Sequence, residues 1–397
     1  MWLPRSPSAT PTGGYLDCVT FRAFRFGVLG LVVALLPAAP ARAAAVSGTP
    51  ERTATFNGVV WAAAYDGETV YVGGDFTAAV VSGKSVTRTR LAAVDARTGA
   101  LRGWAPSANG RVRAIAAAGG SVYVAGDFTA IGSVRRDSLA GLDPVSGAVR
   151  SGLAHTVSGQ PYALASGFGR LYVGGSITAV DGQARSRLAA FNLESGALDG
   201  AWKPAANGTV QALAVGGERV YLGGKFGAVN GATGSSRIAA VHPTSGVVDQ
   251  GFRATSPDDV YGLALSGSTV FTAQGGPGGR VVAYATDGSG RWNLTTDGDA
   301  QTVAVLGDAV YFGGHFDNVC RSPRTGTNGS CVDGSTKRVK LAAAATADGK
   351  LLSWIANGNG SVGVRALAAS GQLGKICAGG EFTKINGAAQ PYFAQFG

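Results

Sequence analysis

Reactive and metal-binding side chains are scarce in this chain of 397 residues. It has three histidines and four cysteines, and charged residues make up 15% of it. The motifs GxSxG, HExxH and CxxC and the Walker phosphate loop do not occur. We therefore predict no catalytic residues and no cofactor. Basic runs and interleaved aromatic and basic residues are also missing, which argues against a nucleic-acid partner.

Long apolar runs are equally scarce. The longest covers about residues 26–36 and is shorter than the roughly 20 residues needed to cross a bilayer. Arg22 and Arg25 precede it and a small-residue site at 41–43 follows it, as is typical of an export signal. We predict an export signal over residues 1–43, with 1–20 an unusual leader that leaves the translation start open. The mature part, 44–397, is predicted to be a single secreted, extracellular, monomeric domain without a membrane span.

Three cysteines remain in the predicted mature chain. Cys320 and Cys331 lie in one polar insertion, and an oxidising compartment favours a disulfide between them. The insertion either shapes a surface for a partner or has drifted in a tolerant loop. Cys377 stands where other copies of the repeat described next have Tyr or Phe, so we predict a buried thiol.

The chain does contain a repeated phrase. VYVGGDFTA at 70–78 returns as VYVAGDFTA at 122–130, and four further copies and one worn copy, VFTAQGG, follow. Each interval of roughly 40 to 66 residues holds about four short alternating stretches separated by glycine turns, and none has a sustained helical period. We predict an all-β fold, a seven-bladed β-propeller with four strands in each blade.

The last copy of the repeat lacks one strand. RTATFNG, residues 52–58, precedes the first copy as WAPSANG, residues 104–110, precedes the second. We predict that this N-terminal strand completes the last blade and so removes the open sheet edges. A column of Trp and Phe is predicted to pack between blades, and paired glycines such as Gly73 and Gly74 to leave room for a close neighbour or a bulge.

The repeat has a recognisable pattern: GG-x-F, a loop, an Arg-(Leu/Ile)-Ala-Ala strand and a Thr-Gly or Ser-Gly turn. It resembles the delta-60 repeat β-propellers of secreted bacterial proteins over nearly the whole mature chain, about 52–397. The resemblance implies a non-catalytic extracellular module and brings no catalytic residues with it. The fifth copy departs from the pattern because it lacks the Asp and Phe, and the sixth because it carries the cysteine insertion.

The direction of the strands places the long loops on one face, which is the predicted binding face. Arginine suits carboxylate or phosphate. The net charge is +10, and it stays positive at +7 when four basic residues and one acidic residue leave with the signal. A positive net charge suits an anionic polymer. The alternative is a solvated edge with hydrogen bonds at strand ends. The predicted basic ring, just before the third strands, consists of Arg90, Arg187, Arg237, Arg280 and Lys340.

A second column follows the glycine pair. In a closed ring its members Asp75, Asp127 and Glu381 would be neighbours, and such an arc of carboxylates could hold Ca²⁺. The alternative is a structural role in turns, because equivalent residues on adjacent blades usually lie too far apart to share one ion.

These observations predict a secreted, non-catalytic binding or interaction module. Its partner would be an anionic glycan, an envelope polymer or a protein. The alternative is an enzyme acting on polysaccharide, a glycosidase or lyase, with carboxylates about 5 to 9 Å apart at the central mouth.

Overall fold

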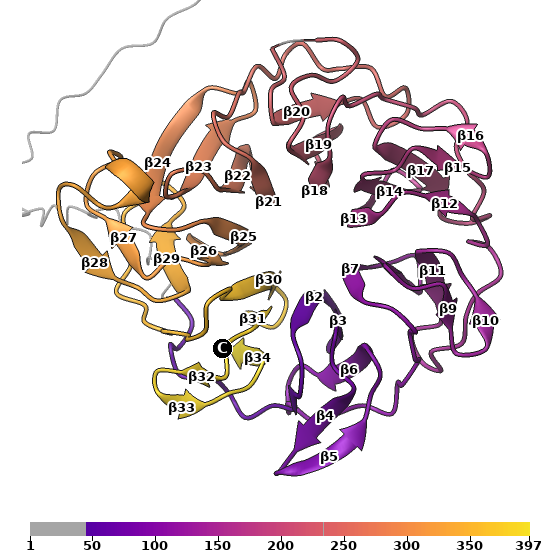
Figure 1. Ribbon diagram of the computed structural model, residues 1–397, viewed down its shortest axis with the longest axis horizontal. Coiled ribbons are helices and arrows are strands. Elements are labelled where there is room, and N and C mark those ends of the chain that lie inside the picture. The colour runs from indigo at the N-terminus through magenta and orange to yellow at the C-terminus, as the bar shows by residue number, and fades with distance from the viewer. Residues whose placement is uncertain (1–44, 233) are drawn as a thin grey trace, which may run out of the picture. The chain divides into compact units, whose positions relative to one another are not determined.

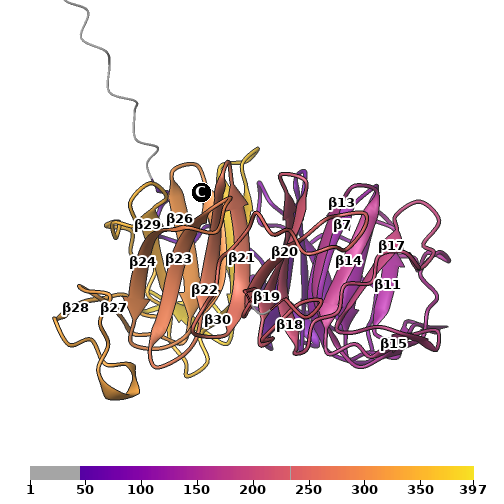
Figure 2. The ribbon, with the colours of Figure 1, turned by 90° about the horizontal axis from the view of Figure 1, so that it is seen from above.

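The computed structural model describes residues 45–232 and 234–397, so the predicted export signal and leader lie outside the described residues. The described residues form a β-propeller, with antiparallel sheets arranged around a centre (Figure 1). Seven of these sheets share one order, in which an inner strand pairs with a second strand and the second with a third. In the edge view, the strands run from one face of the disc to the other (Figure 2).

The inner strands surround the centre in Figure 1. They are β2 (Val60–Asp66), β7 (Val112–Ala118), β13 (Pro161–Gly167), β18 (Val210–Gly216), β21 (Val260–Ser266), β25 (Ala300–Leu306) and β30 (Val364–Ser370). Each contacts the next along the chain, and β30 contacts β2. The last sheet therefore lies against the first.

The second and third strands complete these sheets. The second strands carry the repeated phrase and are β3 (Thr69–Gly74), β8 (Ser121–Gly126), β14 (Arg170–Gly175), β19 (Arg219–Gly224), β22 (Thr269–Gln274), β26 (Ala309–Gly314) and β31 (Lys375–Gly380). The third strands are β6 (Leu91–Asp95), β11 (Leu139–Leu142), β17 (Leu188–Asn192), β20 (Ile238–Val241), β23 (Gly279–Ala285), β29 (Leu341–Ala345) and β34 (Phe393–Phe396).

Short strands structure the connections between these elements. They are β1 (Thr55–Phe56), β4 (Ala78–Val81), β5 (Lys84–Thr87), β9 (Ala130–Ile131), β10 (Val134–Arg135), β12 (Val157–Ser158), β15 (Ala179–Val180), β16 (Gln183–Ala184), β32 (Lys384–Ile385) and β33 (Ala388–Ala389). In the fifth sheet β24 (Gly290–Thr296), β27 (Asn318–Cys320) and β28 (Ser335–Lys337) extend the order to six strands. The one helical turn of the described residues is η1 (Thr327–Gly329), and none of their helices is long and apolar enough to span a membrane.

The glycine pair has both of its predicted roles. A Cβ on Gly73 would lie 2.6 Å from Val112 Cγ1 of the next inner strand. A Cβ on Gly74 would overlap the carbonyl oxygen of Val59, in the connection that leads into the bulged start of β2. Only glycine lets the two backbones and the neighbouring sheet come this close.

The core lies between consecutive sheets, and the aromatic column fills it as predicted. Trp104 is buried against Tyr71 with ring centroids 5.0 Å apart in an edge-to-face arrangement. Its Nε1 donates to Asp143 O, in the turn of the next sheet, at 2.9 Å. The indole thus joins two sheets through packing and through one hydrogen bond.

The fourth position of most sheets is shorter than expected. In the first sheet it is a single bridge between Val94 and Leu101, whereas β24 is a full strand in the fifth. The turn after β6 is closed by Asp95, whose Oδ1 accepts from Thr98 N at 2.8 Å. After Leu101 the chain leaves the sheet to insert Trp104, so little length remains for pairing.

The N-terminal segment differs from the prediction in its register. Ser47 N donates to Gly397 O at 3.1 Å and Glu51 N to Gln395 O at 2.8 Å, so residues 47–51 lie along the last strand. Within residues 52–58, β1 instead pairs with β4, in a small sheet with β5 that lies in the connection between β3 and β6 of the first sheet. The prediction that 52–58 pairs with the last sheet was therefore wrong by about one strand.

The reason for this shift lies in the repeat itself. Asn57 Oδ1 accepts from Thr77 N at 2.9 Å, and Asn109 Oδ1 accepts from Thr129 N at 2.8 Å. RTATFNG and WAPSANG are therefore equivalent, as the sequence indicated. Both connect forward into the following sheet, and the stretch before each of them pairs with the third strand.

Candidate functional site

Each of the seven inner strands begins with a β-bulge. The register shifts between its first and third residues, as it does between Val60 and Ala62 of β2. A bulge inserts one extra residue and re-aims its side chain. The residues at the seven shifts are Trp61, Arg113, Tyr162, Gln211, Tyr261, Gln301 and Arg365.

These seven side chains line one cavity. With Asp299, which precedes β25, they enclose about 470 Å³, a volume within the usual range of ligand pockets. This cavity is termed the central mouth, because the inner strands that carry its lining surround the centre (Figure 1). It lies where the inner strands begin, which is the face that the sequence predicted for binding.

Trp61 is held firmly at the central mouth. The guanidinium carbons of Arg111 and Arg365 lie 4.7 Å and 4.9 Å from its ring centroid. Its Nε1 donates to Asp75 Oδ2 at 2.7 Å. Cation–π attraction keeps both guanidinium groups on the indole, and of these two Arg111 is also paired with a carboxylate, that of Asp75.

The carboxylates predicted to form an acidic arc are instead paired with protein groups. Asp75 accepts from Arg111 Nε at 2.8 Å, and Asp127 forms a bidentate pair with Arg113 through two bonds of 2.7 Å. Glu381 accepts from the backbone nitrogen of Val362 at 2.8 Å. In the described residues no group of three or more His, Cys, Asp or Glu side chains is placed to hold a metal ion. The structure thus does not bring the three predicted metal ligands together.

Two side chains of the central mouth keep unused hydrogen-bonding capacity. Arg365 Nε and Gln301 Oε1 are buried and have no hydrogen-bond partner within the described part of the chain. A buried polar group without a partner costs about 1–3 kcal/mol, which a ligand that supplies the partner would recover. Burial lowers the pKa of Arg365, but a guanidinium remains charged at any physiological pH. The central mouth therefore offers an unpaired cation.

Asp299 is the one carboxylate that lines the central mouth. Burial raises the pKa of its carboxyl group above the usual range, and the positive charge of Arg365 opposes this increase. A raised pKa is a property of acids that donate a proton in catalysis.

Members of the predicted basic ring make internal contacts at the ends of the third strands. Arg90 Nη1 donates to Ala108 O at 2.9 Å, and Arg187 Nη1 donates to Ser176 O at 3.0 Å. Lys340 pairs with Asp317 at 2.8 Å, Arg280 pairs with Asp258, and Arg237 lies 3.5 Å from Asp259. These contacts match the strand-end alternative, and ligand binding by the basic ring stays a prediction.

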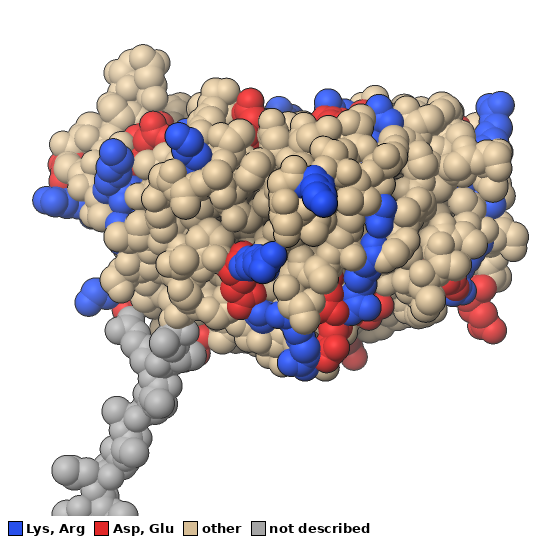
Figure 3. Space-filling view, turned by 90° about the horizontal axis from the view of Figure 1, so that it is seen from below, with Lys and Arg blue, Asp and Glu red and all other residues tan. Residues whose placement is uncertain are grey.

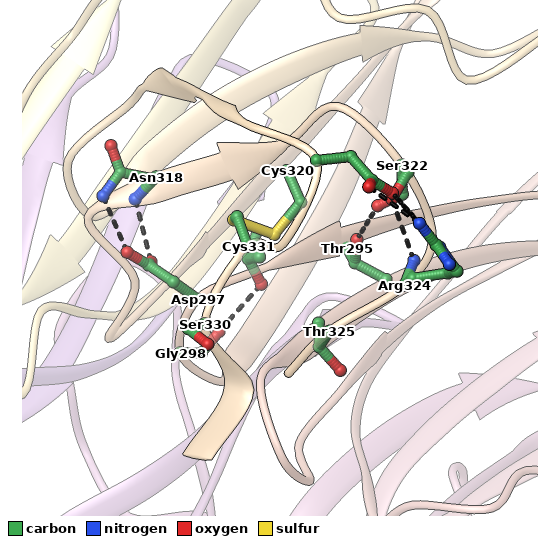
Figure 4. The surroundings of a disulfide bond; sticks show 12 residues. Thr295, Asp297, Gly298, Asn318, Cys320, Ser322, Arg324, Thr325, Ser330 and Cys331 are labelled. Carbon is green, nitrogen blue, oxygen red and sulfur yellow. Dashed lines mark hydrogen bonds and ion pairs between the residues drawn. A yellow bond between two sulfur atoms is a disulfide. The ribbon is translucent and has the colours of Figure 1, made fainter. Parts of the chain in front are cut away.

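The disulfide between Cys320 and Cys331 is confirmed, with Cα atoms 5.1 Å apart (Figure 4). Its loop projects from the edge of the disc beside β27 and β28 (Figure 2). Thr295 Oγ1 donates to Ser322 O at 2.7 Å. Within the loop, Arg324 forms an ion pair with Asp333 at 2.8 Å. The loop lies away from the central mouth, so the two features are separate.

Charges are dispersed over the outer edge. Figure 3 shows Lys and Arg interspersed with Asp and Glu on an edge that is mostly uncharged. The part of the edge seen there offers no one-signed surface for a polymer to follow.

The residues that line the central mouth were missed in the sequence, although a signal for them exists. The inner strands read VWAAA, VRAIA, VQALA and VRALA, with one large and variable side chain in an otherwise small and constant pattern. Such a variable column between packing residues indicates a surface position. The bulges that turn this column to the centre leave no mark in the sequence.

Comparisons with known proteins support the fold. No protein-family model matches this chain, and no curated protein matches it either. Its fold is similar to a chain of the mitotic checkpoint complex, with 12% identity and a TM-score of 0.59 over 94% of this chain and 99% of that one. It is also similar to the WD40 β-propeller domain of Doa1, with 11% identity and a TM-score of 0.54 over 89% and 96%. At these identities the likeness shows the β-propeller fold.

Proposed function

We propose that this β-propeller is a binding module whose ligand enters the central mouth. The observation that carries this proposal is the convergence of seven bulged residues, one from each inner strand, on one cavity. Catalysis would require a constellation of acid, base or nucleophile, whereas this lining is mostly aromatic, amide and guanidinium. Such a lining is suited to holding a ligand by stacking and by hydrogen bonds.

The proposal includes the finer architecture and the location of the protein. The seven sheets are seven four-position blades, and residues 47–51 complete the last one; the contact of β30 with β2 supports this. The protein is a secreted monomer of the delta-60 repeat type, exported by a signal over 1–43. The disulfide is compatible with an oxidising compartment.

The ligand that fits the central mouth best is a carboxylate-bearing glycan. Arg365 is half-buried and its Nε has no hydrogen-bond partner among the described residues, and guanidinium binds carboxylate with two parallel bonds. Tyr162 and Tyr261 supply aromatic faces, and Gln301 supplies an acceptor for a hydroxyl group. An envelope polymer with acidic sugars combines these groups, and a protein partner is the outcome to be distinguished.

The test is binding of the purified protein to uronic-acid polysaccharides, to neutral polysaccharides and to acidic peptides. Binding of the uronic-acid polymer should weaken at least tenfold in Arg365→Ala. It should be unchanged in Arg135→Ala, which removes an exposed arginine of the outer strand β10. Unaltered binding in Arg365→Ala, or a preference for the peptide, would contradict the glycan proposal.

The same measurement separates the central mouth from the basic ring. The double variant Arg187→Ala/Arg237→Ala removes two cations of the ring and leaves the central mouth intact. Loss of binding in this variant and not in Arg365→Ala would move the site to the basic ring.

An enzyme acting on polysaccharide is the second candidate, and the raised pKa of Asp299 favours it. If Asp299 is a general acid, the protein should release reducing ends or unsaturated sugars from a bound polymer. Asp299→Asn should then abolish release while binding persists. Absence of any product from the unmodified protein removes this candidate.

A further inference from the structure

The aromatic column that joins consecutive sheets is interrupted in the second sheet. In the first, third, fourth, fifth and sixth sheets an indole or phenyl ring packs against the aromatic residue of the second strand, as Trp202 does against Tyr172 with ring centroids 5.0 Å apart. Trp202 Nε1 also donates to His242 O, in the turn of the next sheet, at 3.1 Å. The same indole donor reaches a backbone carbonyl of the neighbouring unit in three other cases: Trp104 to Asp143 O, Trp292 to Thr346 O and Trp354 to Ser47 O. The second sheet has Leu153 in this position.

Leu153 packs in this core but makes neither the N–H hydrogen bond nor the ring contact that an indole makes at the other junctions. In the described residues Asn192 O, the equivalent of His242 O, accepts only the turn bond from Gly196 N. Tyr123, the equivalent of Tyr172, makes no ring contact within the described part of the chain. Its hydroxyl group reaches Leu193 O at only 3.5 Å.

A cavity of about 380 Å³ occupies this junction. Its lining comes from the sheet that contains β8 and from the sheet that contains β14, and these two sheets are neighbours in Figure 1. Tyr123, Leu153 and Leu171 form its apolar wall, and residues 192–196 form the opposite side. The backbone of Gly152 lies close to Gly196 beside this cavity.

We propose that this cavity is a docking site for the indole side chain of a partner protein. The occupant is identified by the protein's own repeat, because an indole fills the equivalent place at four other junctions. An inserted indole would contact Tyr123 in the cavity wall and would find Asn192 O as an acceptor for its N–H group. Tryptophan is a common anchor in protein interfaces because one ring combines apolar area with one donor.

The opening of the cavity suits a polypeptide. Ser151 and Ser195 are exposed beside it, and Arg150 and Glu194 offer charges of both signs. A chain that carries the indole could therefore bind hydroxyl and charged groups as it leaves the cavity. This site is distinct from the central mouth and does not depend on the ligand proposed there.

The test uses N-acetyltryptophanamide as the probe and N-acetylleucinamide as its control, titrated into the purified full chain. The tryptophan probe should bind saturably and at least tenfold more tightly than the leucine probe. Leu153→Trp should abolish binding and raise the thermal midpoint by about 2 °C. The spacing from Val149 to Leu153 equals that from Leu198 to Trp202, so the backbone path needed for a tryptophan exists in this fold.

Two further variants keep the test decisive if Leu153→Trp does not fold. Ser151→Arg places a long side chain over the opening without altering the core, and it should also weaken the probe at least tenfold. Arg365→Ala alters only the central mouth and should leave probe binding unchanged. Absence of saturable binding to the unmodified protein, or equal binding in Ser151→Arg, would overturn the proposal. A lower thermal midpoint in a folded Leu153→Trp would do the same.

Discussion

Removal of residues 45–51 should weaken the whole propeller, because these residues connect the end of the chain to its beginning. Ser47 and Glu51 form two backbone hydrogen bonds with the last strand and its end. Val46 N donates to Tyr311 Oη at 3.0 Å, and Trp354 Nε1 donates to Ser47 O at 3.2 Å. The segment therefore holds both the last sheet and the one before it.

The expected loss follows from these bonds. Each contributes about 0.5–1.5 kcal/mol net, and a buried donor such as Trp354 Nε1 costs about 1–3 kcal/mol when it loses its partner. Together they predict that the free energy of unfolding falls by about 3–6 kcal/mol. The ion pair between Lys375 and Glu51 is left out of this sum because Glu51 is partly exposed.

The assay is urea denaturation of two truncated chains followed by tryptophan fluorescence. The first begins at residue 45 and the second at residue 52, so they differ only in the connecting segment. The second should unfold at a clearly lower urea concentration and show increased hydrogen exchange in β34. Equal unfolding free energies, within about 0.5 kcal/mol, would refute the idea that 45–51 completes the last sheet.

Three further predictions test the packing and the titration of single residues. Gly73→Ala should lower the unfolding free energy by about 1–3 kcal/mol because its Cβ would meet the next inner strand. Gly103→Ala is the control, because nothing lies within 4 Å of its Cβ position, and it should not lower this free energy. Urea denaturation of the two variants measures the difference. The hydrogen bond from the Thr98 backbone is the main cause that lowers the pKa of Asp95. The ionised Asp95 therefore stabilises the fold above its unfolded pKa, and this stabilisation is lost as pH falls through its folded pKa. Urea midpoints measured between pH 2 and 6 should accordingly vary less in Asp95→Asn than in the unmodified protein. Burial raises the pKa of Cys377 to about 12, so in a Cys18→Ser chain this thiol should react with a disulfide reagent only after unfolding, and rapid labelling of the native protein would contradict its buried place.

The fold was largely predictable because the repeat sets the same packing problem seven times. Two contacts recur in fixed columns of the repeat: a glycine against a valine of the next sheet, and a Trp against a Tyr. A residue in such a column therefore has a similar role from copy to copy. Cys377 was placed correctly for this reason. The disulfide was predictable because Cys320 and Cys331 share one insertion.

The details that failed depend on where a strand stops pairing. The sequence around Trp104 shows an aromatic residue after a turn, but not that the chain leaves the sheet there. For the same reason the sequence predicted that residues 52–58 pair with the last sheet, whereas residues 47–51 lie along its last strand. Columns such as that of Arg90 and Arg187 could not be interpreted from charge alone, because backbone carbonyls already engage these side chains.

The bulges of the inner strands have a consequence for how such a protein can change over generations. Residues that flank a bulge, such as Val210, pack in the core between sheets, whereas the bulged side chain, such as Gln211, lines the cavity. If the proposed ligand binds there, a substitution at Gln211 should change its recognition with little effect on the core. Recognition and stability would then be separate traits at such a position, and a new specificity could arise by a single substitution without a loss of folding.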